Sequence, residues 1–518
     1  MEIMYLGHAG FCVETADAIL VMDPWLSSHG AFDAAWFQFP QNHHLAPWLR
    51  QKLENSRKPR FIYISHEHHD HFDPEFLATL PKDVTYLIPD FQRPAVKDAL
   101  AALGPSRVIA CAHGEAVAIP GGSVKLYLDD SGLNRDSGIL FRSGQTTFLN
   151  LNDCKLYDEL TQIVRSEGPI SVFTCQFSGA TWHPTCYDYS REEYERIAGH
   201  KVMSKFEMVA RAIDITKAQV YMPSAGPACF LDPALLHLNF EPVNIFPRVA
   251  RFFQYLEKRL ADSATRLVDI APGDLYCVNQ NRLVRNGVTS PDESNFESYI
   301  KSYAAQYTAF FSSQQAQVLP PDAESVLQQL KIELERKLSE FTLHARVQVP
   351  LYFGLSDHAW PLVRVGFVER AVEIVPAVRE SDYYSIAAPA WQVARILDRS
   401  VTWEQFALTF RMRLNRKPDI YQTLMQGFLL MEPEDLNWFC AKLLEIEEKQ
   451  KRVVIEAGGT RYSIDRYCPH QGADLSQGWL DQGRLWTCPR HRWQFALDKD
   501  GRCLTTGASI HAICLENE

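Results

Sequence analysis

The amino-terminal part of the chain carries short apolar runs separated by polar or small residues, a pattern typical of β-strands joined by tight turns. Residues 5–11 and 19–26 predict two such strands. Residues 61–65 read Phe-Ile-Tyr-Ile-Ser, and this apolar run predicts a buried strand. Residues 146–154 and 220–230 predict two more strands, the first ending in a carboxylate and the second in a loop of small residues. We therefore expect strands whose ends present polar or small-residue loops.

The pattern changes to helical periodicity between residues 232 and 435. Residues 325–338 place Leu and Val at helical spacing among charged residues, which predicts an amphipathic helix with its apolar positions facing the core. Residues 345–353 and 362–368 alternate like strands, and a helical stretch begins near residue 390. This combination predicts an α+β module in the middle of the chain.

The length of 518 residues exceeds what one hydrophobic core normally organises, so two to three domains are expected. We place them at residues 1–231, 232–435 and 436–518. A hydrophobic content of 46% with 22% charged residues is that of an ordinary globular protein, and no apolar run approaches the ~20 residues of a membrane helix. The residues from Met1 to Gly7 predict a first strand rather than a signal peptide. We expect a soluble, cytoplasmic protein without a membrane partner.

The cysteines and the net charge indicate the redox compartment and the kinds of partner to expect. The twelve cysteines are scattered, and outside the Cys468 and Cys488 pair none has ligand spacing, which predicts reduced thiols and a reducing cytoplasm. The formal charge of −11 argues against nucleic-acid binding, because phosphate neutralisation requires clustered Lys and Arg. An acidic surface could attract a basic redox partner, although a solvated surface is the commoner explanation.

Near the end of the chain, Cys468-Pro-His470 precedes Cys488-Pro-Arg-His491. In a Rieske [2Fe–2S] centre two thiolates hold one iron and two imidazoles hold the other. A zinc site could use the same atoms. In zinc fingers, however, the two Cys are close together in the sequence and the two His are close together, whereas here each Cys is followed within three residues by a His. The spacing therefore predicts a Rieske cluster held by Cys468, His470, Cys488 and His491.

The residues around these ligands resemble the two cluster-binding loops of Rieske oxygenases and ferredoxins. Gly472 follows the first pair, and Trp493-Gln-Phe495 follows the second. The Rieske proteins of respiratory complexes carry an extra cysteine in each loop, joined as a disulfide, and the corresponding positions here are Ala473 and Arg490. That difference favours the oxygenase-type family.

A second metal motif, H-x-H-x-D-H, directly follows the predicted strand at 61–65. A polar His-rich loop is the alternative, but five ionisable residues after a buried strand would be costly without a partner. The motif resembles that of the metallo-β-lactamase fold, an αββα sandwich in which the first two His bind one metal and the Asp and last His bind a second. His69 occupies the variable position, and the implied ligands are His66, His68, Asp70 and His71.

The same resemblance implies further ligands downstream. Asp153, at the end of the run 146–154, occupies the place of the family's bridging carboxylate. The two remaining ligands of the family are usually His, and the second would be expected near residues 220–230, which contain none. Asp23, near the opening strands, could anchor a ligand imidazole. Candidate replacements are Asp129 or Asp136 for the first missing ligand, and His183 or His113 for the second.

Together, these features resemble the CMP-N-acetylneuraminate hydroxylase family. Residues 403–421 resemble a stretch that follows the lactamase-like domain of those enzymes and is itself reminiscent of sterol-carrier-type modules; its Arg cluster could bind an anionic substrate or form a solvated helix face. That family hydroxylates the N-acetyl methyl group of a nucleotide-linked sugar, using O2 and electrons relayed through its Rieske centre. Its Rieske module comes first, whereas here it is carboxy-terminal, so the resemblance implies the reaction class rather than the substrate.

The expected function is that of a Rieske-dependent monooxygenase. The cluster would pass electrons to a mono- or dinuclear iron site in the lactamase-like domain, which would activate O2 to oxidise a small polar metabolite, such as a sugar-nucleotide or natural-product precursor. The O2-activating metal must lie upstream of His491, because the chain ends shortly after it, and a carboxylate-rich open site suits iron. No Gly-rich dinucleotide fingerprint follows a predicted strand, so an external ferredoxin or flavin reductase would supply the electrons.

Two other functions fit the sequence. A zinc-dependent hydrolase would use the H-x-H-x-D-H residues to generate hydroxide, with the Rieske module as an accessory redox domain. A non-catalytic electron carrier would keep the lactamase scaffold in degenerate form, and the missing His ligands are its best support. Zinc with redox-independent turnover would favour the hydrolase, an empty site the carrier, and O2-dependent turnover with iron the oxygenase.

Overall fold

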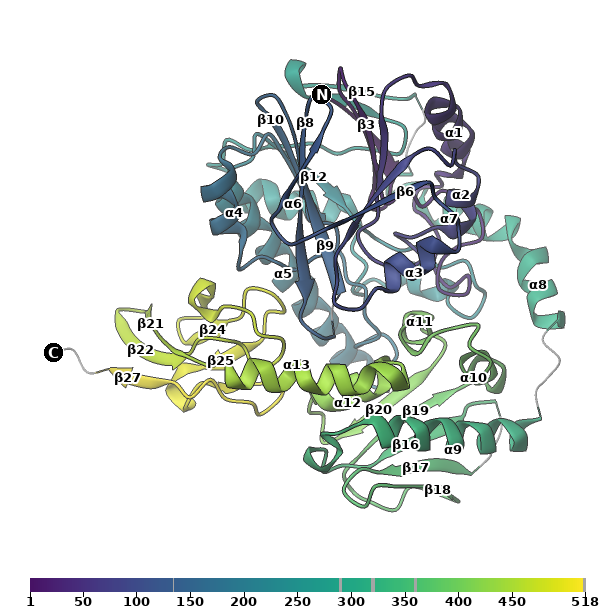
Figure 1. The fold of residues 1–518 in the computed structure, drawn as a ribbon. Coiled ribbons are helices and arrows are strands. Elements are labelled where there is room, and N and C mark those ends of the chain that lie inside the picture. The colour runs from purple at the N-terminus through teal and green to yellow at the C-terminus, as the bar shows by residue number, and fades with distance from the viewer. Residues whose placement is uncertain (134, 288–290, 318–321, 358–360, 516–518) are drawn as a thin grey trace. The chain divides into compact units, whose positions relative to one another are not determined.

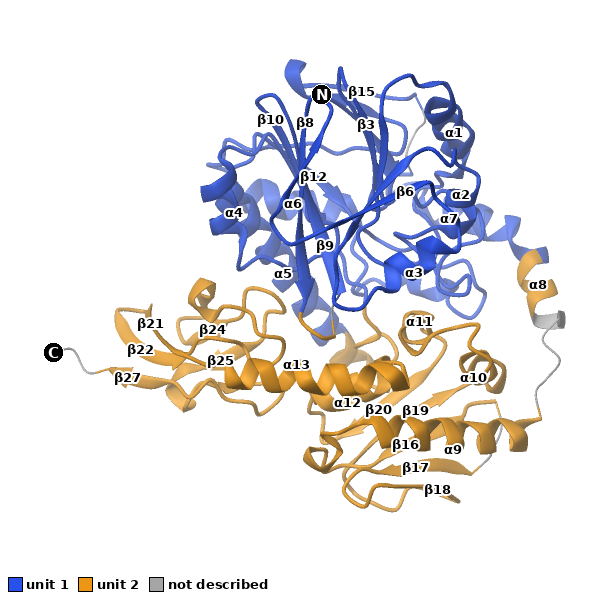
Figure 2. Ribbon diagram, in the orientation of Figure 1, with its two compact units in different colours: residues 1–130, 135–180, 195–309 blue, residues 131–134, 181–194, 310–518 orange. Residues whose placement is uncertain are grey.

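A computed structural model describes residues 1–133, 135–287, 291–317, 322–357 and 361–515 (Figure 1). The chain forms two compact units. Unit 1 contains residues 1–130, 135–180 and 195–309, and unit 2 contains residues 131–134, 181–194 and 310–518 (Figure 2). Two segments of unit 2 thus lie within the range 1–231 expected for the first domain, and the three expected ranges stay a prediction.

Unit 1 contains two mixed β-sheets. In the first sheet, β3 to β6 are parallel, while β1 and β2 pair antiparallel with their neighbours. Its order is β15-β14-β1-β2-β3-β4-β5-β6. The strands are β1 Glu2–Gly7, β2 Gly10–Glu14, β3 Ile19–Met22, β4 Arg60–Tyr63, β5 Thr85–Pro89, β6 Arg107–Cys111, β14 Leu275–Cys277 and β15 Arg282–Val284.

The second sheet has the order β13-β12-β11-β10-β9-β8-β7. Its strands β10 to β13 are parallel and β7 to β10 antiparallel. They are β7 Ala116–Ile119, β8 Gly122–Asp130, β9 Arg135–Ser143, β10 Thr146–Asn150, β11 Val172–Gln176, β12 Val220–Ser224 and β13 Arg266–Leu267. One apolar core, with Phe11 of β2 against Phe148 of β10, fills the space between the sheets.

Helices cover the outer faces of both sheets (Figure 1). The first sheet is covered by α1 Ala46–Asn55, α2 Pro74–Ala78 and α3 Ala95–Ala101, whose apolar side chains share a second core with β3, β4 and β5. The second is covered by α4 Leu160–Glu167, α5 Arg191–Thr216 and α6 Val249–Arg259, with Phe252 of α6 against Tyr221 of β12. The helices α7 Phe296–Gln306 and α8 Thr308–Gln317 follow. This arrangement confirms the expected αββα sandwich.

Local patterns explain where the site-bearing loops begin. The apolar run at 61–65 became β4, which lies between the parallel strands β3 and β5 and is buried on both faces. Residues 5–11, expected as one strand, are instead the end of β1, a turn at His8 and Ala9, and the start of β2. Glycines at positions 7 and 10 permit this close reversal, and Gly7 has a φ of 103°.

The α+β module in unit 2 contains a five-stranded sheet of order β18-β17-β16-β19-β20. The amphipathic helix expected at 325–338 is confirmed as α9, whose Leu330 and Leu334 are fully buried. The strands are β16 Leu351–Leu355, β17 Leu362–Gly366, β18 Ala371–Val375, β19 Tyr383–Ala388 and β20 Arg413–Lys417. The helices are α9 Ala323–Glu340, α10 Ala390–Leu397, α11 Trp403–Leu408, α12 Thr423–Leu430 and α13 Leu436–Glu448.

The Arg cluster of residues 403–421 is not a solvated helix face, so that alternative was wrong. The helix α11 ends at Leu408, and Arg413 and Arg416 lie on β20 instead. Arg416 is buried, and its Nε donates to Asp419 at 2.5 Å. Helical spacing did not continue past α11, because the alternating residues of β20 pair with β19.

The carboxy-terminal part of unit 2 forms two small antiparallel sheets around one core. One sheet comprises β21 Arg452–Ala457, β22 Thr460–Asp465 and β27 Ile513–Leu515. The other comprises β23 Trp479–Asp481, β24 Leu485–Thr487, β25 Gln494–Ala496 and β26 Arg502–Cys503.

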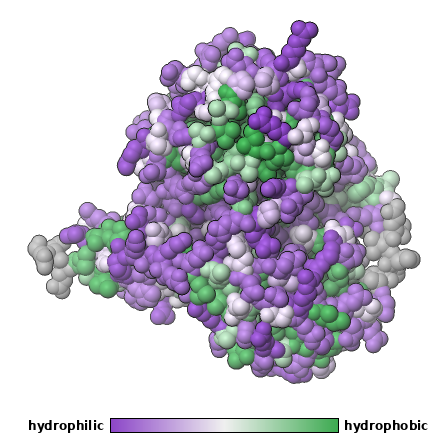
Figure 3. Space-filling model, in the orientation of Figure 1, coloured by the Kyte–Doolittle hydropathy of each residue, from purple (hydrophilic) through white to green (hydrophobic). Residues whose placement is uncertain are grey.

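The face of the molecule in Figure 3 is largely hydrophilic, with apolar side chains in patches. Among the described residues, no helix has the length and apolar character needed to cross a membrane.

Candidate metal centres

The loop after β4 folds the H-x-H-x-D-H motif into a compact cluster in unit 1. The backbone N–H groups of His71 and Phe72 both donate to the carbonyl of His68, at 2.9 and 2.7 Å, so the chain turns back on itself there. The ring centroid of His66 lies 4.5 Å from that of His68 and 4.3 Å from that of His71. This turn brings three imidazoles together.

A buried carboxylate orients His71 from the neighbouring strand end. Asp23 follows β3, is fully buried, and accepts from the backbone N–H and the hydroxyl of Ser65 at 2.8 and 2.6 Å. Its Oδ2 lies 2.9 Å from Nδ1 of His71, and because a carboxylate only accepts, Nδ1 carries the proton. Within the described residues Nε2 of His71 has no hydrogen-bond partner. This is the arrangement by which second-shell carboxylates orient metal-binding imidazoles.

Two carboxylates and a further histidine surround Nε2 of His71. Asp70 Oδ2 lies 3.8 Å from it and Asp153 Oδ1 lies 3.6 Å from it. His8 Nε2 lies 2.9 Å from Asp70 Oδ2. Two groups of three residues can each present ligand atoms within 4.8 Å of one another: His8, Asp70 and His71, and His66, His71 and Asp153.

The electrostatics of this cluster favour a cation. Burial alone would lower the pKa of His71, but Asp70, Asp153 and Asp23 raise it to about 10. Burial would raise the pKa of Asp70, whereas His71 and His8 hold it below its ordinary value. Burial and the Asp153 carboxylate raise the pKa of Asp136. Buried carboxylates that repel one another are normally compensated by a proton or a metal, and the donor set fits a metal.

The other predicted ligands lie at different distances from this cluster. Asp136 Oδ1 is 3.3 Å from Nδ1 of His66, and Asp129 is buried opposite Asp136 in the pairing of β8 with β9. His113 is half-exposed, and its Nδ1 accepts from the backbone N–H of Leu128 at 3.0 Å. His183 belongs to unit 2, where its Nε2 lies 3.0 Å from the hydroxyl of Tyr189 and 3.3 Å from Nη2 of Arg416.

Sequence reasoning missed His8 as a member of the cluster. The residue was read as part of a strand, but it occupies the turn between β1 and β2, with a φ of 52°. The available signal was a histidine between two glycines at the end of the first strand. The position of this histidine near the metal motif follows only from the order of the sheet. The strands β1, β3 and β4 lie in one sheet, so the turn after β1 and the loop after β4 meet at the same cluster.

In unit 2, two similar loops bring the four residues of the Cys/His motif together. In the first, Cys468 N–H donates to Ala473 O and Gly472 N–H donates to Cys468 O, both at 2.9 Å. In the second, Cys488 N–H donates to Trp493 O at 2.8 Å and Arg492 N–H donates to Cys488 O at 3.0 Å. These turns place the two loops so that their cysteine and histidine side chains meet.

The four side chains provide two sulfur and two nitrogen donors. The Cys468 and Cys488 thiols are buried and hydrogen-bonded to each other, and burial together with Cys488 raises the pKa of Cys468. The ring centroids of His470 and His491 are 4.6 Å apart. Thiols held neutral by burial become thiolates when a metal binds, so the donor set fits a Rieske cluster.

Aromatic residues cover one of these imidazoles. Trp493 stacks on His470 with a centroid distance of 4.4 Å and an interplanar angle of 10°. The Tyr421 hydroxyl, from the segment between β20 and α12, lies 3.1 Å from Nε2 of His470. Since Nε2 faces Tyr421, we expect Nδ1 to be the nitrogen that faces iron.

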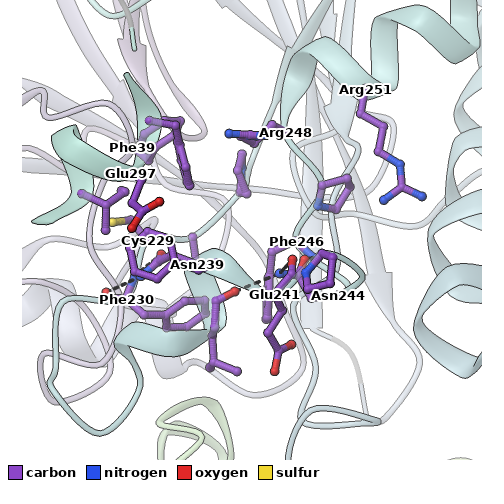
Figure 4. A pocket seen from close by; sticks show the side chains of 18 of the residues that line it. Phe39, Cys229, Phe230, Asn239, Glu241, Asn244, Phe246, Arg248, Arg251 and Glu297 are labelled. Atoms are coloured by element: carbon purple, nitrogen blue, oxygen red, sulfur yellow. Dashed lines mark hydrogen bonds between the residues drawn. The ribbon is translucent and has the colours of Figure 1, made fainter. Parts of the chain in front are cut away.

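Unit 1 also contains a cavity of about 350 Å³, lined by the segment after β12 and by α6 and α7 (Figure 4). Its wall combines Phe side chains with polar and charged ones, among them Glu241 and Glu297. Phe230 connects the cavity to the metal loop through ring contacts of Trp36, Phe32 and His68 at 6.3, 5.0 and 5.8 Å. Arg248 pairs with Glu293 at 2.8 Å, and Arg251 lines the same cavity.

Comparison with known proteins supports the two-part organisation. A model of the Rieske [2Fe-2S] domain matches residues 429–512, and a model of the beta-lactamase superfamily domain matches residues 2–146. A Mycolicibacterium smegmatis protein named "Putative Rieske 2Fe-2S iron-sulfur protein" is 29% identical over 525 residues, covering 98% of each chain.

Two relatives match only short parts of the chain. The cholesterol 7-desaturase of Hemicentrotus pulcherrimus is 44% identical over 46 residues, which is 9% of this chain and 10% of the relative. A UPF0173 metal-dependent hydrolase of Pyrobaculum arsenaticum is 37% identical over 71 residues, which is 14% of this chain and 24% of the relative. Together with the geometry, the family models show that the chain joins an amino-terminal beta-lactamase-superfamily domain to a carboxy-terminal Rieske [2Fe–2S] domain.

Proposed function

We propose that this protein is a Rieske-dependent monooxygenase that oxidises a small polar metabolite. Electrons would enter at the [2Fe–2S] cluster of unit 2 and be used at an iron site of unit 1. The observation that carries the proposal is the presence, in one chain with a Rieske domain, of a second buried cluster whose His71 Nε2 and Asp153 Oδ1 have no hydrogen-bond partner among the described residues.

Iron suits the cluster in unit 1 because its donors mix imidazoles with carboxylates, and such sets hold oxygen-activating iron in proteins. When bound, the metal would supply reductive activation of O2. The proposed ligands are His66, His68, Asp70, His71 and Asp153, and Asp23 keeps His71 in the required tautomer. Asp136 is the stronger additional candidate, because its carboxylate lies 3.3 Å from the His66 ring, whereas Asp129 lies across the strand pair.

The Rieske centre would deliver the electrons one at a time, with Cys468, His470, Cys488 and His491 as its ligands. We propose an external ferredoxin or flavin reductase as the donor and the reducing cytoplasm as the setting, in keeping with cysteines that are free thiols throughout the described residues. The short match to a protein named cholesterol 7-desaturase supports oxidative chemistry.

The cavity beside α6 supports a polar substrate. Arg251 lies in its wall without an ion pair among the described residues, and the wall also contains aromatic side chains and the carboxylates of Glu241, Glu293 and Glu297, of which Glu293 pairs with Arg248. A polar group that Arg251 can bind, joined to an apolar or planar part, as in a sugar-nucleotide or a natural-product precursor, would fit these features.

A zinc-dependent hydrolase is the second candidate, because a short segment matches a protein named as a metal-dependent hydrolase. In that case a zinc-bound hydroxide would carry the reaction, and the Rieske domain would be accessory.

Metal and sulfide analysis of anaerobically purified protein, with electron paramagnetic resonance after dithionite reduction, separates these functions. Wild type is compared with a His66→Ala/His68→Ala variant. Iron beyond that of the cluster, lost in the variant while the Rieske signal persists, is the expected result. Zinc at the second site would support the hydrolase, and no second metal would refute both enzymatic proposals.

A further inference from the structure

We infer that His8 is a metal ligand of the cluster in unit 1 and replaces the histidine that is missing from the loop after β12. The inference rests on the proposed metal site and adds one ligand to it. Its basis is the arrangement of His8, Asp70 and His71, whose ligand atoms lie within 4.8 Å of one another and whose side chains are all buried.

The backbone directs the His8 ring toward the cluster. His8 has a φ of 52°, in the left-handed region that non-glycine residues adopt uncommonly and in which Asn, Asp and His are enriched. The turn is closely packed, because a Cβ atom at Gly7 would lie 2.6 Å from Nδ2 of Asn42. Trp25 then packs edge-on against the His8 ring, at a centroid distance of 5.2 Å and an angle of 87°. A strained backbone that aims a side chain at a cluster is typical of functional sites.

The His8 ring meets atoms that a metal would also contact. Its Nε2 lies 2.9 Å from Asp70 Oδ2, and a cation at this point would replace the proton that this hydrogen bond requires. In the described part of the chain, Asp70 Oδ1 and His71 Nε2 are buried and have no hydrogen-bond partner. A hydrogen bond from His8 alone therefore leaves the cluster unsatisfied, which a buried site normally avoids.

The loop after β12 explains why a residue from the first turn could take this role. Residues 223–226 read Pro-Ser-Ala-Gly and offer no imidazole. The backbone N–H of Ala225 donates to the carbonyl of His8 at 2.9 Å, so this loop packs directly on the His8 turn. The imidazole absent from one segment is thus present on the segment that touches it.

The test uses Co(II) bound at the second site, with the Rieske cluster intact, because X-ray absorption at the cobalt edge then reports on that site alone. Wild type, His8→Asn and His29→Asn are compared. Asn tolerates a positive φ at position 8, and His29 is an exposed histidine of unit 1 paired with Glu75, which makes it a matched control.

We expect His8→Asn to lose one imidazole per chain from the cobalt shell and to bind cobalt at least tenfold more weakly in chelator competition, while His29→Asn matches wild type. An unchanged imidazole count in His8→Asn would overturn the inference, since a residue that only orients Asp70 would leave the shell intact.

Wild type alone decides the matter if His8→Asn does not fold. Imidazoles of His8, His66, His68 and His71 would give four per chain, and a count of three or fewer would overturn this four-imidazole set. Wild type that binds no cobalt would refute the proposed metal site itself. Cobalt bound without the His8 imidazole would refute only this inference.

Discussion

Replacing Asp23 by Asn should weaken metal binding in unit 1 by changing the tautomer of His71. Asp23 Oδ1 accepts from the backbone N–H of Ser65, a donor that cannot rearrange, and Oδ2 faces Nδ1 of His71. In Asp23→Asn the amide oxygen must stay with the Ser65 N–H, so the amide NH2 turns toward His71. Nδ1 must then accept, and the proton moves to Nε2, the atom that faces Asp70 and Asp153.

The expected loss of metal affinity is that found for other residues that orient a metal-binding imidazole. Loss of a residue that orients a metal-binding imidazole costs ~10- to 100-fold in metal affinity, or about 1.4 to 2.8 kcal/mol. The assay is competition with a chromophoric chelator, with the Rieske electron paramagnetic resonance signal as an internal measure of intact unit 2. Asp73→Asn is the control, because Asp73 is also buried in this loop region but accepts from backbone N–H groups of Leu26, Ser27 and Phe76. Unchanged affinity, or equal weakening in Asp73→Asn, would refute the tautomer argument.

Two further predictions concern unit 2. Tyr421→Phe should raise the reduction potential of the Rieske cluster with its resonance signal retained. With Nδ1 of His470 on iron, Nε2 would carry the proton and donate to the phenol oxygen, an interaction that favours the oxidised state. An unchanged potential in redox titration would contradict this. Burial lowers the pKa of Lys337 from 10.5 to about 7. Between these two pH values the unfolded chain binds more protons than the folded chain, so the stability of unit 2 should rise with pH over this range. Lys337→Met should flatten that rise, by at most about 1.4 kcal/mol per pH unit, in urea titrations at several pH values.

The sequence predicted best those features whose residues are neighbours in the chain. The H-x-H-x-D-H motif follows one buried strand. That strand, β4, could be predicted from its continuous apolar run, because a central parallel strand is covered on both faces. The Rieske domain was likewise readable from two short segments. In each case the chemistry depends on local spacing, which a single sequence contains.

Features that depend on tertiary pairing were less accessible. His8 lies 62 positions before Asp70, and their contact exists because β1 and β4 belong to the same sheet. The contact of Asp136 with His66 similarly requires β9, from the second sheet, to begin beside the loop after β4. A solvated helix face, one of the two possibilities left open for the Arg cluster, was wrong for Arg416 because alternating and helical spacing are hard to separate over a few residues. The burial of Arg416 on β20 follows from the pairing of β20 with β19.

The aromatic cover over His470 makes the two Rieske imidazoles unequal toward a redox partner. Tyr421 and Trp493 enclose His470, which is only 6% exposed, whereas His491 is partly exposed. A donor protein that approaches from solvent therefore reaches the ring of His491 more directly than that of His470. The fold gives this cluster an accessible side and a sheltered side, so that docking of an electron donor and internal tuning of the cluster can change independently during evolution.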